Sequence, residues 1–191
     1  MTAPLPTAAT ELLSEWLPPD DSPARPLMTL STIGLDGYPD ARSVLLSAWG
    51  PSGFALHTDS RSRKAVELAE TPRAALTMVW PELKRQLVIQ GDVTVDGPGE
   101  RALAYARRSR YLQLLAWLND PAYAVSPEPS RVAGWAQFDR AHPQLDAPPT
   151  WIGYRVAPVR VTFWHGREDA ASRRIEYALV DGSWTESVLP G

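Results

Sequence analysis

The sequence contains no cysteine and only three histidines, and both facts narrow the chemistry open to it. Without cysteine the chain can form no disulfide, thiolate metal site or cysteine nucleophile. His57, His142 and His165 show no metal-ligand spacing, so we expect no metal site. No Ser-His-Asp set or carboxylate pair stands at an interpretable spacing either. The sequence therefore assigns no catalytic side chain, which is typical of enzymes whose cofactor performs the difficult step.

The chain also lacks an excess of positive charge and any long apolar run. It has 191 residues with 19 basic and 22 acidic side chains, a formal net charge of −3. Nucleic-acid-binding proteins usually present a net basic face, so we expect no nucleic-acid partner. No apolar run approaches the roughly 20 residues of a membrane-spanning helix, and the first residues do not form a cationic apolar signal. We therefore expect a cytoplasmic protein that does not associate with membranes.

Short alternating or apolar runs bounded by turn residues predict strands along much of the chain. The predicted strands cover residues 26–33, 40–47, 54–58, 73–80, 85–96, 151–155, 159–164, 175–180 and 184–189. Residues 34–37 and Asp181-Gly182 predict hairpin turns. Strands dominate, so we expect a mainly β fold, an antiparallel, Greek-key-type barrel, closed or partly closed, with flanking helices.

Apolar residues at helical spacing predict helices over residues 10–17, 99–118 and 131–140. Residues 119–130 are rich in Pro, Ser and Asn and predict a mobile loop. We therefore expect an N-terminal helix and linker over residues 1–25. A single domain over residues 26–191 follows, with a helical insertion at about residues 99–140.

A further helix is predicted from the serines at 60 and 62 to Thr71, and its start is cationic. The N-terminus of a helix carries partial positive charge, so Arg61, Arg63 and Lys64 are unfavourable there unless something negative lies among them. We therefore predict that an oxyanion such as a phosphate binds at this helix start. Arg42, in the apolar strand just upstream, likewise needs an acidic partner or a ligand anion.

These strand and helix-start blocks resemble the flavin-binding core of the pyridoxamine 5'-phosphate oxidase family, FMN enzymes with a split β-barrel fold that include phenazine-biosynthesis oxidases. Similar blocks continue in the family's order over most of residues 26–190. The resemblance implies that the strand lies along the flavin and that the helix start holds the FMN phosphate. The cofactor residues implied in this half of the chain are Arg42, Ser43, Val44, Leu45, Leu46, His57, Thr58, Arg63 and Lys64. His57 stands where the family commonly has a tyrosine, and either hydrogen-bonds the flavin or fills space.

Gln86, Trp164 and Arg174 match family residues that complete the FMN site. In the family this Trp and Arg come from the neighbouring subunit, so the resemblance implies a homodimer with two cofactor sites at the interface. Taken alone, a strand glutamine is more often an exposed residue, and a strand tryptophan more often packs in a core. The assignment of these three residues therefore depends on the resemblance.

The resemblance weakens at the residues that bind the substrate phosphate in the family. A lysine, a tyrosine and a serine among those residues correspond to Ser47, Ala104 and Leu112, and the arginine is retained as Arg108. The Arg-x-His pair that covers the ring corresponds to residues 170–172. Losing several charge-assisted contacts, at about 1.5–3 kcal/mol each, lowers the affinity for a phosphorylated substrate by orders of magnitude. The candidate substrate-binding residues are Ser47, Arg108, Leu112, Ala170 and Ser172.

The resemblance thus implies an FMN-dependent oxidoreductase that transfers a hydride from a carbon beside nitrogen, or from an aromatising ring, to flavin N5 and then to oxygen. We expect an aromatic or cyclic small-molecule substrate that is flatter, larger and less anionic than pyridoxine phosphate. Two alternatives stay open. One is a diverged pyridoxine/pyridoxamine 5'-phosphate oxidase with a replacement clamp of Arg107, Arg108 and Arg110, and the other is a non-catalytic flavin-binding protein.

Overall fold

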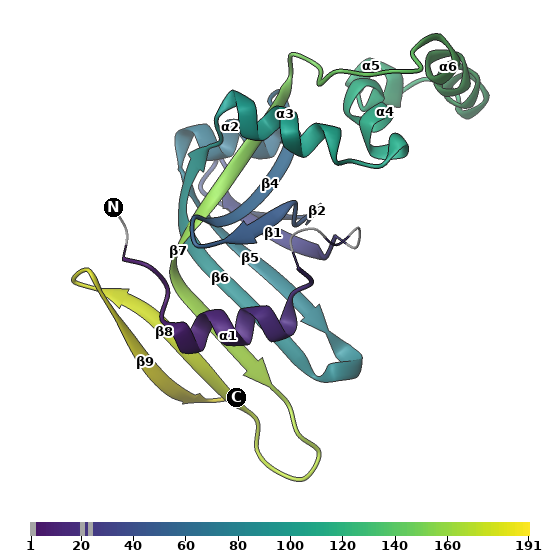
Figure 1. The fold of residues 1–191 in the computed structure, drawn as a ribbon. Helices are drawn as coiled ribbons and strands as arrows, with labels where there is room; N and C mark the ends of the chain where they lie inside the picture. The colour runs from purple at the N-terminus through teal and green to yellow at the C-terminus, as the bar shows by residue number, and fades with distance from the viewer. Residues whose placement is uncertain (1–2, 20–21, 23–24) are drawn as a thin grey trace.

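The computed structural model describes residues 3–19, 22 and 25–191, and within them a curled antiparallel sheet of nine strands dominates (Figure 1). The strands are β1 (Leu27–Ile33), β2 (Pro39–Leu45), β3 (Ala48–Gly50), β4 (Gly53–Asp59), β5 (Arg73–Trp80), β6 (Arg85–Val95), β7 (Trp151–His165), β8 (Arg173–Val180) and β9 (Ser183–Pro190). The prediction of a mainly β, antiparallel fold with flanking helices is confirmed, and the sheet curls into a half-barrel.

Six α-helices and one 3-10 turn flank the sheet in the described part of the chain. They are α1 (Thr7–Trp16), α2 (Arg63–Glu70), the 3-10 turn η1 (Pro81–Leu83), α3 (Pro98–Ala106), α4 (Arg110–Leu118), α5 (Pro121–Ala124) and α6 (Glu128–Ala141). In Figure 1, α2 and α3 lie at one end of the sheet, and α4, α5 and α6 project beyond that end. The hairpin of β8 and β9 lies at the opposite end.

Strand β7 connects the two ends of the sheet. Residues 154–165 of β7 pair with β6, whereas along its other edge residues 151–156 pair with β4 and residues 160–165 pair with β8. The strand order is β2-β1-β5-β6-β7-β4-β3, with β8 and β9 added beyond the second half of β7. Because a strand rises about 3.3 Å per residue, β7 separates the two ends of the molecule by tens of ångströms.

Helix α1 closes part of the core, as the spacing of its apolar residues predicts. Leu13 is almost fully buried, and the Trp16 ring meets the Phe163 ring edge-on with centroids 5.2 Å apart. Both residues therefore belong to the packing that joins α1 to the sheet. The linker predicted after this helix lies partly outside the described residues, because residues 20–21 and 23–24 are not described.

Three local expectations are corrected by the structure. The helix predicted over residues 99–118 is broken into α3 and α4, and the Ser109 hydroxyl caps the second helix by accepting a hydrogen bond from the Leu112 amide across 3.4 Å. Residues 119–130 form α5 and the start of α6 rather than a continuous loop, and α6 is longer than the predicted 131–140. A serine placed between two apolar helical runs was the available signal for the first break.

Strand β7 is continuous where the sequence predicts two strands, and the reason lies opposite Pro158. The register of β6 and β7 shifts between Gln90 and Gly91, and Gly91 faces Pro158. Proline lacks the N–H of the strand ladder and is tolerated at such irregularities. Gly91 is needed there, since a Cβ atom would lie 2.1 Å from the Ala157 carbonyl oxygen.

Candidate functional site

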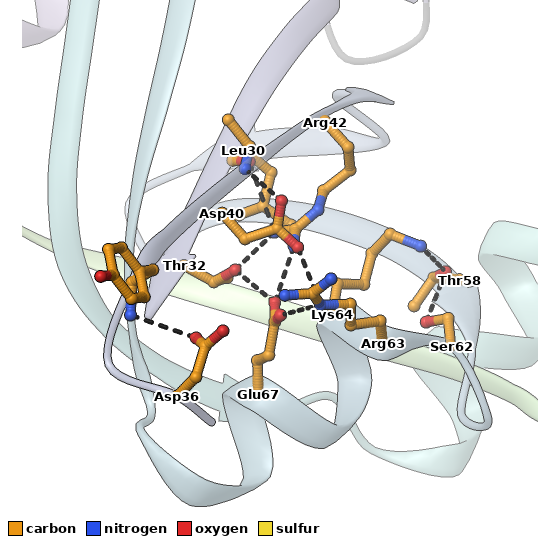
Figure 2. Close-up of polar contacts among 12 residues, drawn as sticks. Leu30, Thr32, Asp36, Asp40, Arg42, Thr58, Ser62, Arg63, Lys64 and Glu67 are labelled. Atoms are coloured by element: carbon orange, nitrogen blue, oxygen red, sulfur yellow. Dashed lines mark hydrogen bonds and ion pairs between the residues drawn. The ribbon is translucent and has the colours of Figure 1, made fainter. Parts of the chain in front are cut away.

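The start of α2 brings together a lysine and two hydroxyls, as Figure 2 shows. Lys64 Nζ donates a hydrogen bond to Thr58 Oγ1 across 3.2 Å, and the Thr58 and Ser62 hydroxyls lie 3.4 Å apart. Within the described ranges, no carboxylate lies within 4.0 Å of the Lys64 ammonium. Burial, and then the nearby Arg42 charge, lowers the pKa of Lys64. A half-buried cation with one neutral partner, next to two hydroxyls at a helix N-terminus, is suited to bind an oxyanion.

The two arginines nearest this lysine are held by protein carboxylates instead. Arg42 Nη2 lies 2.7 Å from Glu67 Oε2 and 2.8 Å from Asp40 Oδ2. Arg63 Nε lies 2.9 Å from Glu67 Oε1 and 3.1 Å from Asp40 Oδ2. Figure 2 shows both guanidinium groups turned toward Glu67, whereas Lys64 extends toward Thr58. The acidic partner that the sequence analysis left open for Arg42 is therefore present.

Glu67 forms the centre of this group, although its side chain is only 1% exposed. It also accepts a hydrogen bond from Thr32 Oγ1 across 2.6 Å. Burial alone would raise the pKa of Glu67, but the hydrogen bonds from Thr32, Arg63 and Arg42 lower it below its ordinary value. The carboxylate is therefore charged at neutral pH and fixes both arginines.

Arg61, the remaining arginine of the helix start, is likewise paired with acids. Its guanidinium lies 2.7 Å from Asp59 Oδ2 and 3.1 Å from Asp120 Oδ2, and these partners raise its pKa. Protein carboxylates thus neutralise Arg61 and Arg63, whose positive charges are unfavourable at the helix N-terminus. Lys64 is left as the cation of this turn that has no carboxylate within 4.0 Å among the described residues.

Two adjoining cavities lie beside this helix start. Cavity A has a volume of about 490 Å³ and cavity B of about 950 Å³. Cavity A is lined by the predicted cofactor residues Arg42, Ser43, Val44, Leu45, His57, Thr58 and Lys64. Leu46 is buried in the core, and Arg63 lies outside the cavity wall with 69% of its side chain exposed. The structure thus gathers seven of the predicted cofactor residues around one cavity.

Cavity B contains the positions that correspond to the substrate phosphate-binding residues of the family. Ser47, Ala104, Arg108 and Leu112 all line it, together with Arg25, Arg107 and Arg155. The walls of the two cavities share Leu45, His57, Arg108 and Leu112. A ligand in one cavity therefore lies next to a ligand in the other.

Arg108 stands at this junction. Its guanidinium lies 4.6 Å from the centroid of the Trp151 ring and donates a hydrogen bond to Ser47 Oγ across 3.3 Å. Burial, and then the charge of Arg25, lowers the pKa of Arg108 to about 10. It remains cationic at neutral pH, and in the described part of the chain no carboxylate lies within ion-pair distance of it. This is a second place suited to an anionic group.

Arg110 has a different position from the one required for a substitute clamp. It lies 2.7 Å from Asp139 Oδ1 of α6 and also donates to the His142 carbonyl oxygen. It is absent from the walls of both cavities. The break between α3 and α4 turns Arg110 away from Arg107 and Arg108, so the three arginines do not form one clamp.

Gln86, Trp164 and Arg174 lie together, but far from both cavities. They form one cross-strand row, in which Gln86 pairs with Trp164 and Trp164 pairs with Arg174. His57 pairs with Gly153 on the same strand β7, eleven residues before Trp164 and therefore roughly 35 Å away. Ala170 and Ser172 lie in the adjoining loop between β7 and β8. Within one chain, these five residues do not reach the cavities.

Sequence reasoning missed Glu67, Trp151 and the buried Asp96. Glu67 had a detectable signal, because it stands four residues after Arg63 on one helix face. Asp96 ends one predicted strand and Trp151 begins another, and neither pattern indicated a site. Among the described residues, no group of three metal-ligating side chains occurs, and no helix is long and apolar enough to cross a membrane.

Comparison with known proteins places these features in a family. Residues 14–164 match the sequence profile of pyridoxamine 5'-phosphate oxidase, and residues 151–190 match that of the pyridoxine 5'-phosphate oxidase C-terminal dimerisation region. The pyridoxine/pyridoxamine 5'-phosphate oxidase of Caulobacter vibrioides is 35% identical over 188 residues, covering 93% of this chain and 82% of the relative. That of Actinobacillus pleuropneumoniae is 37% identical over 163 residues, covering 85% and 78%.

Two solved structures share the fold. PhzG from Burkholderia lata, solved in complex with tetrahydrophenazine-1-carboxylic acid, has a TM-score of 0.79 at 24% identity and covers 96% of this chain and 88% of its own. A pyridoxamine 5'-phosphate oxidase-related, FMN-binding protein from Nostoc punctiforme has a TM-score of 0.71 at 20% identity and covers 99% and 98%. The half-barrel with its C-terminal hairpin is therefore a shared architecture.

Proposed function

The chain belongs to the pyridoxamine 5'-phosphate oxidase family, and from this premise we propose that it is an FMN-dependent oxidase of a nitrogen-containing, anionic ring compound. The observation that carries the proposal is Lys64. Its ammonium is half-buried beside Thr58 and Ser62 at the start of α2, with no acidic partner among the described residues. Such a site needs an anion to complete it, and the terminal phosphate of FMN is one.

The volume of cavity A and the hydroxyl and ammonium groups in its wall support FMN as the cofactor. Lys64, Thr58 and Ser62 would hold the phosphate at one end, and Ser43, Val44 and Leu45 would run along the flavin. Arg42 and Arg63 would act mainly through Glu67, by fixing the helix start and adding positive potential. FMN, when bound, supplies the hydride acceptor that the protein lacks, with oxygen as the final acceptor. The side chains of cavity A would bind and orient it.

We further propose a homodimer in which each chain completes the cofactor site of the other. Gln86, Trp164 and Arg174 lie roughly 35 Å along β7 from His57, which lines cavity A, so they serve a cofactor only in a neighbouring chain. The match to a C-terminal dimerisation region over residues 151–190 supports this arrangement. Ala170 and Ser172 would then approach the partner's cavity as well.

Cavity B would receive the substrate. It is larger than a pyridoxine-sized molecule requires, and its positions 47, 104 and 112 carry Ser, Ala and Leu. Arg108 remains to orient one anionic group, and Leu45 and Leu112 offer an apolar wall. We therefore favour a flat ring compound with a carboxylate over a phosphate ester. The tetrahydrophenazine carboxylic acid bound by PhzG is a compound of this kind, although that likeness concerns the fold alone.

A second candidate is pyridoxine/pyridoxamine 5'-phosphate oxidase activity itself. The observation in its favour is that Arg25, Arg107 and Arg155 line cavity B together with Arg108, so a dianion would meet several cations. The relatives of this name, at 35–37% identity, support it further. Arg110 does not belong to this set, because Asp139 holds it on α6.

An anaerobic flavin-reduction experiment tests the proposal. FMN-loaded protein would be mixed with tetrahydrophenazine carboxylate, other carboxylated cyclic imines and amines, or pyridoxine 5'-phosphate. We expect a carboxylated ring compound to bleach the flavin absorbance faster than pyridoxine phosphate, and air to restore it. Faster bleaching by pyridoxine phosphate would establish the second candidate. Tight FMN binding with no bleaching by any compound would indicate a non-catalytic flavoprotein.

A further inference from the structure

His57 and Asp96 face each other in the interior with atoms that lack hydrogen-bond partners. His57 Nε2 lies 3.9 Å from Asp96 Oδ2, and their side chains are 2% and 3% exposed. Both ring nitrogens of His57 and Oδ2 of Asp96 are buried without a hydrogen bond. Buried polar atoms are nearly always hydrogen-bonded, because leaving one unpaired is unfavourable. Three such atoms beside one cavity indicate that a ligand group completes them.

The neighbouring residues hold the two side chains in place. Arg155 Nε donates to Asp96 Oδ1 across 2.9 Å, which leaves Oδ2 as the free oxygen. The Trp151 ring stacks on the His57 ring at 5.3 Å between centroids and 14° between planes. Gly153, opposite His57 in the sheet, leaves room for the imidazole, since a Cβ atom there would lie 2.7 Å from Nε2. The arrangement is therefore built by several elements and is not a loose contact.

Both side chains also belong to the wall of cavity B, and His57 lines cavity A as well. An atom placed about 2.9 Å from each of two groups that are 3.9 Å apart has ordinary hydrogen-bond geometry to both. One donor atom that lies beside the line joining these two atoms, rather than between them, can therefore bridge His57 and Asp96. This position lies where the proposed substrate and cofactor would meet.

We propose that His57 and Asp96 form a subsite for a nitrogen of the substrate, an amine or a ring N–H, that donates hydrogen bonds to Asp96 Oδ2 and to one ring nitrogen of His57. This inference rests on the proposed function and makes its substrate class more specific. The ligand would carry an anionic group toward Arg108 and an N–H group toward this pair. Arg108 and Asp96 have opposite charges, so the ligand is oriented from both ends.

The electrostatics of the pair suit a donor group. Burial is the main cause that lowers the pKa of His57 to about 4, and the charges of Arg108, Arg155 and Arg101 lower it further. The imidazole is therefore neutral at physiological pH and offers an acceptor nitrogen. Burial also raises the pKa of Asp96, against the opposing charge of Arg155, so a cationic nitrogen nearby would stabilise its carboxylate.

The test compares matched ligands on the FMN-loaded protein, with the flavin reduced under anaerobic conditions so that no turnover occurs. The pairs are pyridoxamine 5'-phosphate with 4-deoxypyridoxine 5'-phosphate, and 3-(aminomethyl)benzoate with 3-methylbenzoate. Each pair differs only in an amine replaced by hydrogen. We expect wild type to bind the amine of at least one pair tenfold or more tightly than its partner. Asp96→Asn should lose this preference but retain affinity for the partner.

Glu100→Gln provides the matched control, because Glu100 lines the same cavity and contacts Arg155 across 3.4 Å but is 60% exposed. It should keep the wild-type preference. Equal preference in wild type, Asp96→Asn and Glu100→Gln, or no preference in wild type for either pair, would overturn the subsite.

Nitrogen-15 NMR of labelled histidine gives an independent readout on the wild-type protein. The bound amine should shift the ring resonances of His57 and leave those of His142 and His165 unchanged. An unmoved His57 resonance with all four compounds would refute the subsite. Failure of the protein to bind FMN would instead refute the proposed function, and the histidine spectrum of the flavin-free protein would still decide the subsite.

Discussion

The buried carboxylate of Glu67 on α2 lies 2.7 Å from the guanidinium of Arg42 on β2, as measured from Oε2 to Nη2. A buried carboxylate is favourable only when its partners remain in place. Arg42, Arg63 and Thr32 are those partners, and they join the helix start to strands β1 and β2. The cavity lining at Lys64 therefore depends on a residue that does not line either cavity.

We expect Glu67→Gln to lower the free energy of unfolding by about 3 kcal/mol, because it leaves two arginines with one fewer carboxylate in a buried setting. Urea denaturation followed by circular dichroism would measure the change. Glu70→Gln, an exposed position on the same helix, should change the value by less than about 0.5 kcal/mol. Equal stability of the two variants would contradict the central role of Glu67.

Lys64→Ala should weaken FMN binding by at least about tenfold while leaving riboflavin binding nearly unchanged, because the lysine is assigned to the phosphate. Flavin fluorescence quenching measures both constants. Arg63→Ala should have the smaller effect, since Glu67 and Asp40 already hold that arginine. The double change of Arg63 and Lys64 to Ala should abolish FMN binding, and an unchanged affinity would contradict the assignment of the phosphate to this helix start.

Lys84→Ala, at an exposed lysine paired with Glu168, is the control and should keep the wild-type affinity for FMN.

These assignments show how far sequence alone could go. Alternation of apolar residues predicted eight of the nine strands, with β7 divided in two and the three-residue β3 missed, and the cationic helix start predicted an anion site. The sequence could not predict that Arg42 and Arg63 pair with Glu67 whereas Lys64 does not. This difference depends on contacts between distant residues, such as that of Thr32 with Glu67, which are 35 residues apart. The position of Arg110 depended on a helix break that periodicity over residues 99–118 concealed.

A mixed-dimer experiment tests whether the cofactor sites are shared between chains. The double variant with Arg63 and Lys64 changed to Ala, and the single variant Arg174→Ala, should each lose FMN when pure. Refolded together in equal amounts, they should regain it at about a quarter of all sites, because half of the dimers are mixed and each mixed dimer has one undamaged site. FMN bound per chain is the measured quantity. Recovery of no sites, or a monomer by light scattering that holds FMN tightly, would show that each chain is complete alone.

The stability of the protein should fall in mild acid because of His57. An unfolded histidine titrates near pH 6.5 and folded His57 near 4. Between these values the unfolded state binds more protons, so the contribution of neutral His57 is fully present above pH 6.5 and is lost as the pH falls toward 4. We expect a loss of about 2 kcal/mol between pH 7.5 and 4.5 from this residue. The raised pKa of Asp96 opposes part of it.

His57→Phe removes this contribution, so its unfolding free energy should change less over the same pH interval than that of wild type. His142→Phe, at an exposed histidine on the α6 terminus, should behave like wild type. Urea titrations at the two pH values measure the difference. Identical pH dependence in wild type and His57→Phe would mean that the imidazole titrates normally and is open to water.

The continuity of β7 limits how this family member can vary in length. Phe163 faces α1 and the core, and its neighbour Trp164 faces the other side of the sheet. Inserting or deleting one residue between Gly153 and Phe163 would reverse these two faces, because side chains alternate along a strand. It would also change the spacing between the two proposed half-sites. The length of β7 therefore sets the distance between the two proposed half-sites, and length changes are tolerable only in the loops that precede and follow this strand.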